Sequence, residues 1–192
     1  MAFPDDAPRA HFERAAQWHE WLESNHATAK GMFVVSWRAS TGRPSIGYAE
    51  MVEEALCFGW VDSRQVRLDE ERTMLWFTPR RNGAGWSPSN KERIERLTAT
   101  GRMRAAGERV VASAHLDGSW TKLDAINNLE LPPDLTGELD RHTGAADVFA
   151  GFPRSVRRGI LEWIASAKTP TTRARRIEDT AIKAAAGERA HQ

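Results

Sequence analysis

The sequence predicts an α+β fold that is mainly helical, in which a small N-terminal antiparallel or mixed sheet of about three strands precedes an all-helical C-terminal half. Two observations favour this fold. Short runs of β-forming residues occur before residue 80. After that position, apolar residues recur at helical spacing behind Ser-Pro and Thr-Pro pairs. We expect an α+β segment over 1–86 and a helical segment over 87–192 packed on it, as one compact unit with a helical extension.

The elements of the first segment follow from their residue types. Apolar residues at helical spacing predict helices, and runs rich in Phe, Val and Trp predict strands. Ser45 is suited to cap the second helix, and the polar turn at 69–72 favours an antiparallel hairpin. The expected order is a helix over 11–25, a strand over 32–37, a helix from Ser45 to near Gly59, and strands over 60–68 and 74–78.

The second segment is expected to be helical throughout. Ser87 before Pro88, and Thr169 before Pro170, each place an N-cap residue ahead of a proline in the first turn. Two further prolines at 132 and 133 stiffen a connection before a short helix. The expected helices run from 88 to 101, from 103 to 117, from just after 133, from 155 to 167 and from 170 to 187.

Composition restricts the class of protein. Apolar residues make up 41% and charged residues 28% of the 192 residues, as in ordinary globular proteins. Eight tryptophans are unusual for this length, and we expect most of them in the core. The one cysteine, Cys57, excludes an internal disulfide and a multi-cysteine metal site. Because no run is long and apolar enough for a membrane span and no secretory signal is visible, we expect a cytoplasmic protein.

The stretch from 55 to 90 contains the most informative group of residues, a candidate binding site. Large aromatic rings, two adjacent arginines and a glycine loop precede a helix start, where unpaired N–H groups and partial positive charge favour a phosphate or carboxylate. A plain strand-to-helix turn with solvated arginines is the alternative, since neither a Walker lysine nor a Gly-x-Gly-x-x-Gly pattern is present. The candidate binding residues are Trp60, Asp62, Arg80, Arg81, Trp86, Ser87 and Asn90.

Other reactive side chains carry weaker patterns. Cys57 lies near the C-terminal end of a predicted helix between apolar neighbours, which favours a buried core thiol over a nucleophile. His19, Glu23 and His26 share a helix face, but a solvated face has the same pattern, so neither a metal nor a cofactor is expected. As a general acid or base, Asp62 lacks an evident partner, and pairing with an arginine or with backbone N–H groups is preferred.

A secondary basic patch is expected in the last helices at Lys168, Arg173 and Arg176. Such residues can contact nucleic-acid phosphates, but no helix-turn-helix or zinc-finger pattern accompanies them, and basic residues also favour helix C-termini. Nucleic acid is therefore not the expected partner. A small anionic ligand, or a peptide or protein, is expected instead.

Matches to a known family are spread along the chain, and the most specific are the Gly-Trp-x-Asp motif ending at Asp62 and the Trp-Ser pair at 86–87. The further matching positions are 21–22, 48, 55–58, 79–81, 90, 97, 101–103, 106–107, 167–168, 172–173 and 175–177. On these residues the chain resembles the YdeI/OmpD-associated family, described as bacteriocin-protection proteins, over nearly its whole length. In that family the loop before Trp86 often carries a lysine and a serine, whereas Gly83 and Ala84 stand here, which weakens the anion hypothesis.

The resemblance implies a mostly helical α+β protein that is linked to resistance against bacteriocins or antimicrobial peptides, and it supplies no agreed reaction or catalytic residues. We therefore expect a non-enzymatic binding protein with a role in protection or envelope stress. Two alternatives stay open. One is an enzyme of unknown class that uses the same pocket with Asp62 as acid or base, and the other is a nucleic-acid accessory protein.

Overall fold

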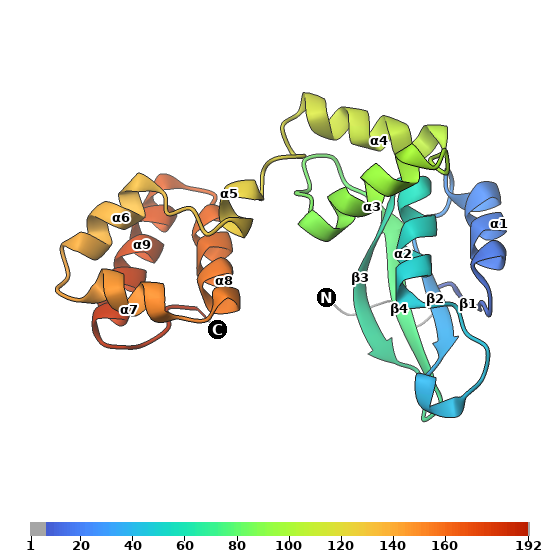
Figure 1. Cartoon of the computed structure of the whole chain (residues 1–192), viewed down its shortest axis with the longest axis horizontal. Helices are drawn as coiled ribbons and strands as arrows, with labels where there is room; N and C mark the ends of the chain where they lie inside the picture. The colour runs from blue at the N-terminus through green and yellow to red at the C-terminus, as the bar shows by residue number, and fades with distance from the viewer. Residues whose placement is uncertain (1–6, 192) are drawn as a thin grey trace. The chain divides into compact units, whose positions relative to one another are not determined.

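Two compact units make up the chain in the computed structural model, which describes residues 7–191 (Figure 1). The first unit ends at Lys122 and the second begins at Leu123. The first contains β1 (Arg9–His11), α1 (Ala15–Asn25), β2 (Met32–Trp37), the 3-10 turn η1 (Ala39–Thr41), α2 (Tyr48–Cys57), β3 (Trp60–Arg67), β4 (Arg72–Pro79), α3 (Pro88–Ala99) and α4 (Ala105–Leu116). The second contains α5 (Asp124–Asn127), α6 (Pro133–Asp140), α7 (Ala145–Gly151), α8 (Arg154–Ala165) and α9 (Pro170–Ala185). Helices α3 and α4, which we grouped with the helical segment, lie in the first unit because both pack on α2.

The sheet of the first unit has four strands in the order β1-β2-β4-β3. Strands β2 and β3 both pair antiparallel with β4, whereas β1 pairs parallel with β2. The mainly helical α+β class with an all-helical C-terminal half is confirmed in the part of the chain that the structure describes. The expected number of strands is wrong by one, because β1 has only 3 residues and is too short to show an alternating pattern in the sequence.

Two of the three predicted helix caps are confirmed. The hydroxyls of Ser87 and Thr169 each accept a hydrogen bond from the backbone N–H three residues later, at 3.3 and 3.1 Å. The cap predicted at Ser45 is wrong, because α2 begins after Gly47, whose N–H donates to the Glu50 carboxylate at 2.9 Å. The carboxylate therefore satisfies the start of the helix, and the Ser45 hydroxyl has no hydrogen-bond partner among the described residues.

Two helices of the second unit are absent from the sequence prediction. Helix α5 has 4 residues and α7 has 7 residues. Neither is long enough to repeat its apolar positions over two full turns, so the helical period is not visible in the sequence.

Three tryptophans form the centre of the first core and are at most 2% exposed: Trp18, Trp60 and Trp86. The indole N–H of Trp18 donates to the Met51 carbonyl at 3.1 Å, and that of Trp60 donates to the His26 carbonyl at 3.2 Å. Each ring therefore buries its surface while its polar group keeps a partner. The expectation that most tryptophans are core residues is confirmed for these three, and the other five of the eight are partly exposed. Those that pack against the cores while partly buried are Trp21, Trp120 and Trp163.

The second unit has a separate core made by one face each of α6, α7, α8 and α9. At most 2% of the surface is exposed for Leu135, Leu139, Ala145, Phe149, Ile160, Ile164, Ala181 and Ala184. None of the helices in the described residues combines the length and apolar character needed to cross a membrane.

Helix α2 contacts several other elements of the first unit. It packs against α1, β3, α3 and α4, and Figure 1 shows it lying along one face of the sheet. Its C-terminal end meets α4 at very short range. A Cβ added at Gly107 would lie 2.4 Å from the Cys57 carbonyl oxygen, and the N–H of Arg104 donates to the same oxygen at 3.1 Å. Only glycine fits at position 107 without moving α4 away from α2.

We predict that Gly107→Ala lowers the free energy of unfolding of the first unit by about 2–3 kcal/mol, since the added methyl group meets backbone that cannot rotate away. The matched control is Gly137→Ala in α6, where an added Cβ meets nothing within 4 Å. That change is expected to stabilise the second unit by about 0.5–1 kcal/mol. Urea unfolding followed by circular dichroism tests both. Equal effects of the two substitutions would contradict the close packing.

Candidate functional site

The residues predicted to form the binding site do not all come together at one place in the first unit. Trp60 and Trp86 are core residues, 1% and 2% exposed. Ser87 caps α3, and the side-chain oxygen of Asn90 accepts from Arg93 Nη1 at 3.3 Å. These four residues therefore have structural partners inside the protein.

The glycine loop already holds a carboxylate of the chain itself. The N–H of Gly83 donates to Asp117 Oδ2 at 3.1 Å, and the Lys122 ammonium donates to the Gly83 carbonyl at 2.9 Å. Hydrogen bonds, first from Ser119 and then from Gly83, lower the pKa of Asp117. An outside anion at this backbone N–H would have to displace Asp117.

Arg80 is a half-buried cation with incomplete compensation. Its guanidinium lies 3.7 Å from the centre of the Trp86 ring, and Nη2 donates to the carbonyls of Gly85 and Ala84. Its Nε is buried without a hydrogen-bond partner among the described residues. Burial lowers the pKa of Arg80 to about 10, and the negative charge of Asp62 only partly opposes this. The burial of Arg80 therefore leaves a positive charge that an anion would stabilise.

Asp62 has a partner that the sequence does not reveal. The hydroxyl of Tyr48, at the start of α2, donates to Asp62 Oδ2 at 3.0 Å. Partial burial raises the pKa of Tyr48, the bond to Asp62 raises it further, and the charge of Arg93 acts in the opposite direction. Asp62 is thus held by a tyrosine at the edge of β3.

A hollow of about 320 Å³, here called the Arg80 hollow, opens where the ends of β3 and β4 meet α4. Of the predicted residues it brings together Trp60 and Arg80, while Asp62 and Asn90 do not line it. Arg81 is exposed and lines a small adjoining void with Arg80 and Trp86, which are also predicted site residues. This void shares Arg80, Asn82, Val110 and Ser113 with the hollow. The remaining residues around the hollow are His26, Phe58, Gly59, Pro79, Asn82, Ala106, Arg109, Val110 and Ser113.

Several lining residues of the hollow were missed by sequence reasoning. Ala106, Arg109, Val110 and Ser113 stand at positions i, i+3, i+4 and i+7, so they share one face of α4. That spacing was visible in the sequence. What the sequence did not show is that this face of α4 covers Gly59, where a Cβ would meet the Val110 side chain at 2.7 Å.

The secondary basic patch of the second unit is largely paired. Arg173 forms two hydrogen bonds to the Asp134 carboxylate, at 2.7 and 2.9 Å. Arg176 donates to the Trp163 carbonyl and to Ser166 Oγ, and its guanidinium lies 4.9 Å from the Trp163 ring centre. Lys168 is exposed. Arg173 and Arg176 therefore have hydrogen-bond partners within the second unit.

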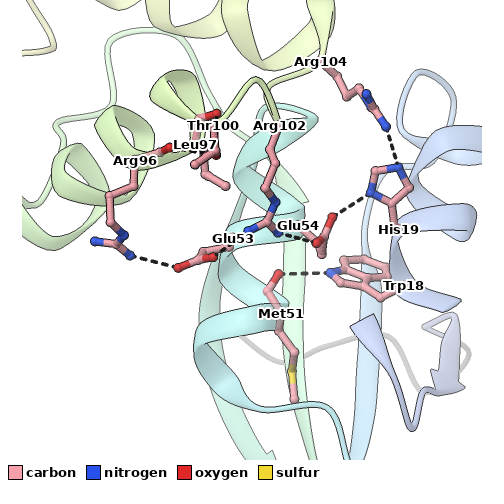
Figure 2. A network of polar contacts seen from close by, with 10 residues as sticks. All are labelled: Trp18, His19, Met51, Glu53, Glu54, Arg96, Leu97, Thr100, Arg102 and Arg104. Carbon is pink, nitrogen blue, oxygen red and sulfur yellow. Dashed lines mark hydrogen bonds and ion pairs between the residues drawn. The ribbon is translucent and has the colours of Figure 1, made fainter. Parts of the chain in front are cut away.

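A network of polar contacts links α1, α2 and the residues just before α4 (Figure 2). Glu54, 8% exposed, accepts from His19 Nδ1 at 2.7 Å and from Arg102 at 2.6 Å. Arg104 donates to His19 Nε2 at 3.1 Å. Because a guanidinium can only donate, Nε2 of His19 is the acceptor in this contact, which leaves Nδ1 to donate to Glu54. Both ring nitrogens are used, so His19 acts as a connector between Glu54 and Arg104.

The two histidines of the metal site that was considered along α1, His19 and His26, bind different partners within the protein. His19 bonds to Glu54, whereas His26 Nδ1 donates to the Leu22 carbonyl at 2.9 Å. Within residues 7–191, no three His, Cys, Asp or Glu side chains are grouped so that they could hold a metal ion.

Cys57 is the buried core residue that the sequence predicted. It is 1% exposed, and burial raises the pKa of its thiol to about 11. A thiol in this state is a poor nucleophile at neutral pH.

Comparison with known families assigns the two parts of the chain differently. The chain belongs to the family described as Domain of unknown function (DUF8412), whose model matches residues 10–110. A second family model, described as Bacteriocin-protection, YdeI or OmpD-Associated, matches residues 128–187 and confirms the resemblance for this part of the chain. The two motifs that seemed most specific in the sequence, which end at Asp62 and Ser87, lie in the DUF8412 match instead. No curated protein and no solved structure matches the chain. All lining residues of the Arg80 hollow except Ser113 thus lie within the DUF8412 match, and the bacteriocin-protection match lies wholly in the second unit.

We predict that Glu54→Gln lowers the free energy of unfolding by about 3 kcal/mol, because it leaves Arg102 and His19 without the charge that they surround. Glu53→Gln is the matched control, since Glu53 lies next to it in α2 and also binds Arg102 but is more exposed. Its loss is expected to cost under about 1 kcal/mol. Chemical denaturation measures the free energy of unfolding of both variants. Equal losses of stability would refute the claim that the buried charge of Glu54 matters more than the exposed charge of Glu53.

We also predict that Cys57 reacts with a thiol-specific aromatic disulfide at pH 8 at least about a hundredfold more slowly in the folded chain than in denaturant. The raised pKa keeps the thiol protonated, and burial keeps the reagent out. Rapid stoichiometric labelling of the folded chain would show that the end of α2 opens readily.

Proposed function

We propose that this chain, as a member of the DUF8412 family, is a binding protein whose first unit holds a small anion, a phosphate or carboxylate, in the Arg80 hollow. The observation that carries this proposal is the half-buried guanidinium of Arg80, for which no carboxylate of the described residues lies within ion-pair distance.

The energetics of Arg80 favour an anionic ligand. Backbone carbonyls and the Trp86 ring stabilise the guanidinium in part, but burial still lowers its pKa. A charge removed from water without an opposite charge is destabilising, and an anion next to it restores much of the lost solvation energy. The hydrogen bonds that result are charge-assisted and about twice as strong as neutral ones.

The other side chains around the hollow suit the same ligand. Arg109 supplies a second guanidinium, and Asn82 and Ser113 supply an amide and a hydroxyl. His26 already donates through Nδ1, so its Nε2 can donate to an anion when the ring is protonated. No aspartate or glutamate is among the lining residues. The donors and the charges around the hollow therefore favour a negative ligand over a neutral or positive one.

The remaining predicted residues have supporting roles in this proposal. Trp86 holds the Arg80 guanidinium in place, and Asp62 helps to keep it charged. Arg81 is the exception, because it is exposed, does not line the hollow and makes no contact with the ligand in this proposal. Ser87 and Asn90 order the first turn of α3.

The family description of the second unit supports a biological setting. Its model is described as bacteriocin-protection, and we propose that anion binding by the first unit serves a protective role of this kind. The proposal requires recognition and no turnover. Assay of host-cell survival under bacteriocin challenge, with the intact chain and with an Arg80→Met variant, tests this part.

We predict that Arg109→Gln weakens pyrophosphate binding about tenfold, because it removes one charge-assisted contact from the hollow. Isothermal titration calorimetry at low salt measures the affinity, which is expected to fall as salt rises. Arg81→Gln is the matched control, since it removes an exposed cation that does not line the hollow. An affinity that Arg109→Gln leaves unchanged would exclude the hollow, and a larger loss for Arg81→Gln would place the ligand at the glycine loop.

A further inference from the structure

A second cavity of about 510 Å³, here called the α2 cavity, lies between the sheet and the N-terminal end of α2. It shares no lining residue with the Arg80 hollow. Its volume is in the range of pockets that hold small organic molecules. The lining residues are Ser36, Trp37, Arg38, Ala39, Arg43, Ser45, Ile46, Gly47, Tyr48, Met51, Gln65, Thr73 and Leu75.

The inner wall of the α2 cavity is apolar. Ile46, Met51 and Leu75 are 3–5% exposed and come from the loop before α2, from α2 itself and from β4. An inorganic ion has no apolar surface that could pack against these three side chains. The occupant therefore has an apolar body that packs against these three side chains.

Two hydroxyls of the cavity have unused hydrogen-bonding capacity. Ser36 is 8% exposed, and its hydroxyl meets only Thr73 Oγ1, at 3.5 Å. That separation is longer than an ordinary O–H···O bond of about 2.5–3.0 Å. The buried hydroxyl oxygen of Ser45 has no partner in the described residues. Buried polar groups are nearly always satisfied, so two such groups beside one cavity indicate a polar ligand atom.

The charges around the cavity have one sign. Its only charged lining residues are Arg38 and Arg43. Arg43 is committed to Glu71 and lies 4.2 Å from the Trp37 ring centre, whereas the Arg38 guanidinium donates only to the Glu70 carbonyl, at 3.2 Å. Arg38 can therefore still pair with an anion.

Three carboxylates bind lining residues of the cavity but do not line it themselves. Glu50 accepts from the Gly47 N–H, Glu71 accepts from Arg43, and Asp62 accepts from the Tyr48 hydroxyl. The positive end of the α2 dipole adds to the same sign of potential.

We infer that the α2 cavity binds a medium-sized organic carboxylate, whose apolar body packs on Ile46, Met51 and Leu75. Its carboxylate pairs with Arg38 and accepts from the free hydroxyls. This site is independent of the Arg80 hollow, and neither site needs the other to be occupied.

Titration of the full chain with octanoate, 1-octanol, octylammonium and acetate tests the ligand class. Calorimetry is expected to show octanoate binding at least tenfold more tightly than octylammonium and octanol, because only octanoate offers both the apolar body and the negative charge. Acetate is expected to bind at least tenfold more weakly than octanoate. Equal affinities for octanoate and octylammonium, or no octanoate binding at millimolar concentration, would overturn the inference.

Two substitutions place the ligand in the cavity. Arg38→Gln is expected to weaken octanoate binding at least fivefold and to leave octanol binding unchanged. The matched control is Arg67→Gln, which removes an exposed cation from β3 that pairs with Glu70 and lies outside the cavity. Equal effects of the two variants on octanoate would show nonspecific charge attraction and overturn the site.

Ser45→Ala provides a second, independent measurement. It removes a buried hydroxyl that has no partner, so the melting temperature of the free protein is expected to stay or rise while octanoate binds at least threefold more weakly. Unchanged octanoate affinity would remove Ser45 from the site. Pyrophosphate binding in the Arg80 hollow is expected to be the same in all of these variants, which separates a failure here from a failure of the proposed function.

Discussion

The packing of α2 between the sheet and helices α1, α3 and α4 is the constraint on which the first unit depends. At its C-terminal end, Gly107 lets α4 approach the backbone of α2, and Phe58 and Gly59 then line the Arg80 hollow. At its N-terminal end, Gly47 and Tyr48 border the α2 cavity. Both proposed sites are therefore formed by the two ends of one buried helix, and a shift of α2 would alter both.

The balance of buried charge distinguishes structural groups from candidate sites in this unit. Glu54 is buried but surrounded by His19 and Arg102, so its charge is fully used inside the protein. Arg80 is half-buried and meets only carbonyls and an aromatic ring. Since a buried charge is destabilising until it is compensated, the first group is a structural link and the second is the place where we propose that an anion binds.

Local pattern accounts for most of the secondary structure. Strand β2 was expected with its observed bounds, and the caps at Ser87 and Thr169 were recognised because a hydroxyl before a proline is a local signal. The failures are also local in origin. Strand β1 and helices α5 and α7 are too short to repeat their apolar period. The cap expected at Ser45 is replaced by the Glu50 carboxylate, which accepts from the Gly47 N–H, and the residue types of the turn do not show this contact.

By itself the sequence determined the α+β class and the burial of Cys57, because these depend on residue type and on spacing within one element. The family resemblance that it indicated over nearly the whole chain is confirmed for residues 128–187. Only the tertiary structure decided which cations are compensated. Arg173 meets Asp134, 39 residues away in the chain, whereas Arg80 meets no carboxylate at pairing distance among the described residues. Such pairings join residues far apart in sequence, and periodicity within a helix or strand carries no information about them.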